Sequence, residues 1–288
     1  MCLALVLSLV FSINTINIQV QAVNKDIISL KPDKVYNQFD LDGDGEQDSL
    51  SFKEHINPEW GTEMCDSFYV YVNNEEILHI GNIDYYKDTC SLSLFRFKNR
   101  YFLYVYLIGD DGSGPCDIYV YENGLFRKVF DISSYMYKVG FHKGSKVKAV
   151  DKNKVTLQFE CMSTAVASVN MIGDFTYKNG KMSPVSKIIK VVNYYNWDEY
   201  DKHPGLYKKD RQPYLTVERK IQLYKSYNKK SKNGVVNKGE KVKILKCYID
   251  HNKAVYQLKT KKNKVGWFSI SDESAMNGKY FKEIIYSG

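Results

Sequence analysis

The sequence lacks an assembled catalytic motif. None of its five histidines forms a His-Glu-x-x-His pair, and no Gly-x-Ser-x-Gly segment occurs. A hydrolase needs a nucleophile or activated water, a base and a group that orients the base, and no local pattern supplies them together. Paired carboxylates are harder to recognise, because any two of the 33 acidic residues could form them. The sequence therefore favours a non-enzymatic role and leaves a secreted hydrolase of cell-wall or glycan polymer as an alternative.

Cysteine is also scarce, with six residues in 288 and no Cys-x-x-Cys pair. Separations of about 25 residues or more between the later cysteines argue against a zinc site, which usually draws two ligands from one short turn. Cys65 with Cys90 and Cys116 with Cys161 are possible disulfide pairs. Buried free thiols are the other possibility, and the spacing alone does not distinguish the two.

Long helical patterns are absent as well. No stretch of twelve or more residues has a clear 3.6-residue hydrophobic period. Short runs instead alternate apolar and polar residues, as in Ser67–Val72, Ser91–Phe97 and Asp117–Tyr121, and turn signals such as Asn-Gly separate them. The 24 tyrosines also suit strands. We therefore expect an all-β protein whose residues 23–190 form an antiparallel β-sandwich or an incomplete-propeller-like domain.

One hydrophobic run stands near the start of the chain. Residues 3–13 are nearly all apolar, and Val20 and Ala22 place small residues before a cleavage point, although no Lys or Arg precedes the run. This pattern predicts a signal peptide over residues 1–22. The run is too short for a confident membrane span. The protein is thus expected to be secreted or held at the cell surface, without stable membrane insertion after cleavage.

The sharpest chemical pattern is an acidic loop. Asp40, Asp42, Asp44 and Asp48 occupy positions 1, 3, 5 and 9 of a short turn, and Glu46 at position 7 is placed to offer its backbone carbonyl. Two intervening glycines allow the backbone to curl, so that alternate side chains can converge on one cation. Position 12 is serine rather than glutamate, and the following residues alternate like a strand. The loop is therefore not an EF-hand.

The Asp-x-Asp-Gly-Asp-Gly-x-x-Asp pattern resembles the calcium loops of FG-GAP/VCBS-type β repeats. This resemblance implies a structural Ca²⁺ ion and a loop that leads directly into a strand. A solvated Asp/Gly turn between two strands is the alternative.

The C-terminal residues 214–288 follow a predicted linker at 191–213. A turn and strand in Val235–Leu245, a strand at Ala254–Leu258 and the Gly-Trp-Phe of Val265–Phe268 resemble a bacterial SH3-like domain. The resemblance implies a small β-barrel that binds cell-wall peptides. The segment that is usually Leu-Asn-Val-Arg in such domains is replaced here by Ile-Gln-Leu-Tyr-Lys at residues 221–225. Candidate groove residues are Tyr224, Tyr227, Trp267 and Phe268, although the tryptophan also suits the barrel core.

Charge separates the two parts of the chain. Residues 214–288 contain 17 Lys/Arg and 6 Asp/Glu, a net charge of +11, whereas the whole chain is +8 and residues 1–213 are therefore −3. A basic unit on an exported protein is attracted to anionic wall polymers or acidic lipid surfaces. A solvated lysine-rich surface is the alternative. Nucleic acid is an unexpected partner for an exported protein without a recognisable binding motif.

The sequence thus predicts a non-enzymatic, cell-envelope-associated binding protein. Its calcium-stabilised β domain would carry or present a binding surface, and its basic SH3-like unit would dock on the cell envelope. Two alternatives to this prediction remain. One is the secreted hydrolase, and the other is a protein-interaction or adhesin module that binds a surface protein.

Overall fold

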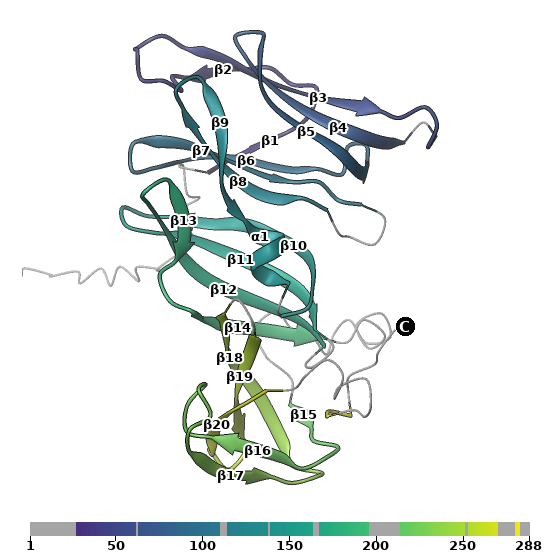
Figure 1. Cartoon of the computed structure of the whole chain (residues 1–288), viewed down its shortest axis with the longest axis vertical. Helices are drawn as coiled ribbons and strands as arrows, with labels where there is room; N and C mark the ends of the chain where they lie inside the picture. The colour runs from purple at the N-terminus through teal and green to yellow at the C-terminus, as the bar shows by residue number, and fades with distance from the viewer. Residues whose placement is uncertain are drawn as a thin grey trace, which may run out of the picture.

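In the computed structural model, three antiparallel sheets are stacked (Figure 1). The structure describes residues 27–61, 63–109, 114–137, 139–163, 167–195, 214–250, 253–269 and 280–282. The predicted signal peptide and residues 196–213 of the predicted linker lie outside these ranges.

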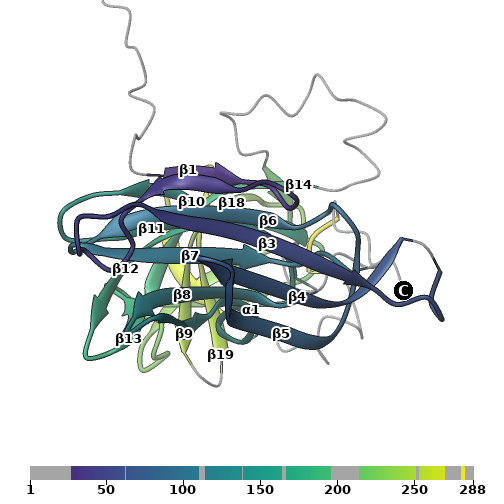
Figure 2. The same ribbon diagram turned by 90° about the horizontal axis from the view of Figure 1, so that it is seen from above.

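The first sheet is a four-stranded meander at one end of the stack. Its order is β2 (Tyr36–Phe39), β3 (Asp48–Ile56), β4 (Met64–Val72) and β5 (Glu75–Tyr86). The second sheet has five strands, in the order β1 (Ile27–Leu30), β6 (Ser91–Phe97), β7 (Arg100–Tyr106), β8 (Cys116–Glu122) and β9 (Leu125–Asp131). Seen from above, the axes of β3, β4, β6 and β7 are roughly aligned, and each neighbouring pair is antiparallel (Figure 2).

The third sheet has eleven strands. Its main path is β10 (Phe141–Val150), β11 (Val155–Ser163), β12 (Ala167–Lys178), β14 (Ile188–Tyr195), β18 (Lys241–Asp250), β19 (Lys253–Thr260), β20 (Val265–Phe268), β16 (Ile221–Tyr224) and β17 (Lys232–Val236). Two short strands lie off this path, with β13 (Lys181–Pro184) beside β12 and β15 (Leu215–Thr216) beside β18. The prediction of an all-β fold of packed antiparallel sheets is confirmed.

The only helix among the described residues is the five-residue α1 (Ile132–Met136). Asp131 caps it by accepting a hydrogen bond from the Ser134 backbone N–H. No helix in the described ranges has the length and apolar character needed to cross a membrane.

The middle sheet is buried on both faces, which explains its nearly continuous apolar strands. In β7, Leu103 and Val105 pack toward the first sheet, whereas Phe102 and Tyr104 pack toward the third. Successive strand residues point to opposite faces, so a strand between two layers needs apolar side chains at every position. Burying each such side chain contributes about 1.5–3 kcal/mol.

Several predicted hairpins close through two residues with positive φ. Asn73 and Asn74 have φ values of 51° and 67°, and Asn123 and Gly124 have 54° and 77°. Asparagine and glycine enter this left-handed region more easily than other residues, and such turns match the twist of the flanking strands. Local turn chemistry therefore sets the β4–β5 and β8–β9 registers.

The third sheet crosses the predicted boundary at residue 190. That boundary falls within β14, and residues 188–190 lie opposite residues 246–248 of β18 in antiparallel register. The C-terminal strands consequently continue the large sheet, and the described strands form no closed barrel of their own. The predicted small barrel is therefore not found as a closed, separate sheet, because β14 pairs with one edge of β18.

One core runs through the same junction. Phe159 and Met171 of β11 and β12 belong to the same buried cluster as Val242, Ile244 and Leu258 of β18 and β19. The C-terminal unit therefore shares its core with the third layer.

All five cysteines in the described residues are free thiols. Neither the Cys65–Cys90 nor the Cys116–Cys161 disulfide is formed, and four of the five thiols are buried. Of the two possibilities in the sequence, the structure has buried free thiols.

Candidate functional site

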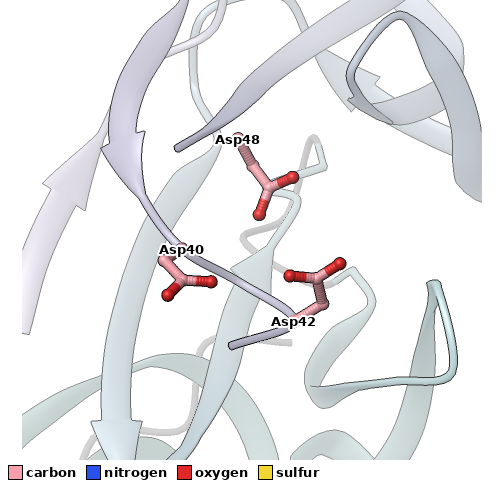
Figure 3. A group of neighbouring side chains, drawn as sticks. All are labelled: Asp40, Asp42 and Asp48. Carbon is pink, nitrogen blue, oxygen red and sulfur yellow. The ribbon is translucent and has the colours of Figure 1, made fainter. Parts of the chain in front are cut away.

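The acidic loop connects β2 to β3 and brings three of its carboxylates together. Oxygen atoms of Asp40, Asp42 and Asp48 lie within 4.8 Å of one another (Figure 3). Asp44 is outside this group, and its Oδ1 accepts a 2.7 Å hydrogen bond from the Glu46 backbone N–H. Three of the five predicted ligand residues therefore converge.

The loop backbone folds around Asp40. Its Oδ1 accepts a hydrogen bond from the Gly43 N–H at 2.7 Å, and its Oδ2 accepts one from the Gly45 N–H at 3.2 Å. The two glycines have φ values of +83° and +93°, and no atom would obstruct an added Cβ at either position. Conformation, rather than space, explains why glycine is used here.

Asp48 joins the loop to the body of the first sheet. It is 7% exposed, and its Oδ2 accepts a 2.7 Å hydrogen bond from the Leu41 N–H. Its Oδ1 accepts a 2.7 Å bond from the side-chain amide of Asn73, in the β4–β5 turn. Leu41 is itself buried, so this carboxylate is fixed at the base of the loop.

The three converging carboxylates suit a hard divalent cation. Their ligand atoms are all oxygen, which Ca²⁺ prefers, and loop carbonyls and water are available to complete a shell of six to eight ligands. An ion here would offset the mutual repulsion of three nearby negative charges. Its chemistry in this position would be structural, since the group lies in a turn between strands.

A second feature is a group of lysines on the β18–β19 hairpin. We call Lys241, Lys243, Lys259 and Lys261 the basic face. Lys243 lies directly opposite Lys259 in the antiparallel register. The residues that alternate with these lysines, such as Val242 and Leu258, point into the core, so the basic face points outward.

Tyr214 is the partner of two of these lysines. The Nζ atoms of Lys243 and Lys261 lie 4.7 and 5.3 Å from its ring centroid. Within the described ranges, no carboxylate forms an ion pair with the basic face. The nearby Glu240 instead accepts a hydrogen bond from the Asn237 N–H. The positive charge of the basic face is therefore not neutralised by these contacts.

An aromatic group lies farther along the same strands. Tyr227 stacks on Tyr248 with centroids 4.0 Å apart, and it meets Trp267 edge-on at 5.8 Å. Tyr224 lies opposite Trp267 in the β16–β20 register. Trp267 is only 6% exposed, so Tyr227 offers more of its ring to solvent.

Phe268 does not join this group. It is 1% exposed and packs against Tyr256 and Phe281 in the core. Adjacent strand residues point to opposite faces, so Trp267 and Phe268 cannot both line one groove. Three of the four predicted groove residues thus share a face, and Phe268 belongs to the core.

Sequence reasoning missed Tyr248. A register shift between Ile244 and Lys246 inserts an extra residue into β18 and changes which positions point outward. The tyrosine hydroxyl donates a hydrogen bond to Asp250 at 2.9 Å. Lys187 Nζ also donates a 2.9 Å hydrogen bond to Asp250 Oδ1, forming an ion pair. This hydrogen bond raises the pKa of Lys187. The bulge, which has no clear sequence signal, concealed the residue.

The buried thiols offer little nucleophilic reactivity. Burial raises the pKa of Cys65 to about 11 and that of Cys116 to about 12. Thiols with such pKa values stay protonated near neutral pH, whereas the thiolate is the nucleophile. These two cysteines do not form the activated nucleophile that a cysteine hydrolase requires.

Comparisons of this chain with protein family models, with curated proteins and with solved structures find no significant match.

Proposed function

We propose that the protein is an exported, non-enzymatic binding protein of the cell envelope, and that its SH3-like C-terminal unit docks on anionic wall polymer through the basic face. The observation that carries this proposal is the direct opposition of Lys243 and Lys259 on neighbouring strands. Like charges placed opposite each other destabilise a sheet. A polyanion would remove this repulsion on binding.

The charge distribution supports the same partner. The basic face belongs to a segment, residues 214–288, with a net charge of +11, and exposed charge of one sign steers ligands of the opposite sign. Such attraction weakens with salt, because the Debye length falls from about 10 Å at 0.1 M to about 3 Å at 1 M. The adjoining Tyr227, which is half-buried and packs edge-on against Trp267, gives the ligand an aromatic ring beside the charge.

Calcium has a structural role in this proposal. Asp40, Asp42 and Asp48 would hold the ion and fix the β2–β3 turn at the far end of the stack from the basic face (Figure 1). The ion would stabilise the first sheet without contacting the anionic polymer.

The test is sedimentation of the purified protein with insoluble cell walls, at low and high salt. A Lys243→Gln/Lys259→Gln variant is compared with a Lys34→Gln/Lys152→Gln control, which removes the same charge from exposed positions of the first and third layers. We expect the basic-face variant to bind about tenfold more weakly, equivalent to about 1.4 kcal/mol. The control should bind like the unmodified protein.

Two results would count against the proposal. Equal binding by both variants would show that net charge, rather than the basic face, determines the affinity. Binding to anionic phospholipid vesicles but not to walls would assign the anion to lipid headgroups instead of wall polymer.

A further inference from the structure

The outer face of the third sheet carries one row of side chains across many strands. The register aligns residues of successive strands from β10 to β16 directly opposite one another. The row is Lys146, Gln158, Ile172, Lys190, Lys246, Gln257, Trp267 and Tyr224.

The members of this row lie on the face of the sheet opposite the main core cluster, where Trp267 is itself buried in a smaller cluster with Tyr248 and Val255. Their strand neighbours Phe159, Met171 and Val191 are buried in the main cluster, so the alternate positions face outward. The side chains of Lys146, Lys190 and Lys246 are exposed accordingly. The basic face is on the same side, because Gln257 and Lys259 are two residues apart on β19.

A second lysine pair lies on this row at the junction of the two units. Lys190 of β14 is directly opposite Lys246 of β18. As in the Lys243–Lys259 pair of the basic face, two positive charges lie directly opposite each other and repel, which destabilises the sheet. No carboxylate forms an ion pair with either lysine in the part of the chain that the structure describes.

The row continues to Lys146 on the edge strand β10. Four inter-strand steps separate Lys146 from Lys246, a contour of about 19 Å at about 4.8 Å per step. Glu160 lies in the neighbouring row, where burial raises its pKa and the charges of Lys143 and Lys146 act in the opposite direction. The row itself contains three lysines and no acidic residue.

We infer that the anion-binding surface extends from the basic face across the junction to β10, and that its ligand is a linear polyanion lying across the strands. This inference rests on the proposed function and specifies its partner. A short anion would contact only the basic face. A long polymer would also reach Lys190 and Lys146, so affinity should rise with chain length until the polymer spans the row.

The experiment titrates the full chain with heparin-derived oligosaccharides from disaccharide to hexadecasaccharide, at fixed salt. We expect affinity, corrected for the number of binding registers on each oligomer, to rise at least tenfold along the series. Lys146→Gln should weaken binding of the hexadecasaccharide about threefold and leave that of the disaccharide unchanged. Lys34→Gln is the matched control, and thermal unfolding should show that both variants keep their stability.

The possible failures separate the two proposals. If affinity does not depend on length, or Lys146→Gln affects short and long oligomers equally, the extended surface is wrong while docking through the basic face stands. If no oligomer binds and walls do not bind either, both proposals are overturned.

Discussion

At the scale of single residues, His142 is a buried group with a clear energetic consequence. It is 7% exposed, and neither ring nitrogen makes a hydrogen bond of normal geometry to any residue that the structure describes. The ring of Tyr106 meets it edge-on at 5.5 Å. Burial lowers the pKa of His142 to about 4, and the Gly144 backbone and the Asp131 carboxylate oppose this shift only in part. The folded protein therefore holds this imidazole neutral.

This depressed pKa predicts acid-sensitive stability. The unfolded chain binds a proton at His142 near pH 6.5, whereas the folded chain does so only near pH 4. The contribution of His142 to the free energy of unfolding is fully present above pH 6.5. It is lost as the pH falls from 6.5 to 4, by about 3 kcal/mol in total. Urea unfolding at pH 7 and pH 4.5 should show a smaller pH dependence for His142→Phe than for the unmodified protein. Burial raises the pKa of Asp117, so this residue gives a pH dependence of the opposite sign. Its effect is the same in the variant and in the unmodified protein and therefore cancels when the two are compared.

The acidic loop gives a second prediction at this scale. Asp42 is exposed, and its interactions are confined to the loop, whereas Asp48 also bonds to Leu41 and Asn73. Asp42→Ala should remove the rise in melting temperature caused by calcium and leave the melting temperature in chelator nearly unchanged. Asp48→Ala should remove the same rise and also cost about 1–3 kcal/mol in chelator, because it leaves the buried Leu41 N–H unpaired. An unmodified protein whose melting temperature ignores calcium would contradict the metal site.

At the scale of strands and turns, local patterns predicted more than long-range pairings did. The acidic loop and the hairpin at Asn123-Gly124 follow from residues adjacent in sequence, and the structure has both turns. The pairing of Ile189 with Cys247 depends on tertiary contact, so no local pattern indicated it. The bulge that turns Tyr248 outward likewise depends on how β18 pairs with two neighbours. Sequence patterns therefore predicted the first part of β18, but they placed residues 191–195 of β14 in a linker and did not indicate the sheet that joins the two strands.

The Gly-Trp of β20 illustrates how packing explains a motif. A Cβ added to Gly266 would lie 2.8 Å from Cβ and 3.0 Å from Cδ1 of Leu223 on β16. Leu223 is fully buried, so it has little room to move. Glycine is required at this position because β16 and β20 approach closely and leave no room for a Cβ. Its backbone conformation is one that other residues also adopt.

This contact predicts that Gly266→Ala destabilises the protein by about 1–3 kcal/mol in chemical unfolding, because the added methyl overpacks the core. The double variant Gly266→Ala/Leu223→Gly should be more stable than the sum of its single changes predicts, since removing both the Cβ and the Cδ1 of residue 223 leaves space for the methyl. Strict additivity in this double-mutant cycle would show that the two residues do not compete for the same space.

At the scale of the whole molecule, the shared sheet and core make the third layer and the C-terminal unit one structural block. The β14–β18 pairing connects their backbones, and one apolar cluster contains side chains of both. Separate domains with a small polar interface would move and unfold independently. A surface built across this junction keeps its lysines at fixed spacing, which suits a ligand that must contact both sides at once.

This organisation predicts that residues 141–195 and 215–268 unfold in a single step. Ile189 is 2% exposed at the junction, so Ile189→Ala should cost about 2–5 kcal/mol and lower the protection of both segments in hydrogen exchange. Val185→Ala, at an exposed position close by in sequence, is the control and should have little effect. If β19 amides lost protection while β11 amides kept theirs, the C-terminal strands would be an independent unit. The row of aligned residues from Lys146 to Tyr224 would then be interrupted whenever that unit opened. In Ile189→Ala, the affinity for long polyanions should consequently fall to the affinity for short ones.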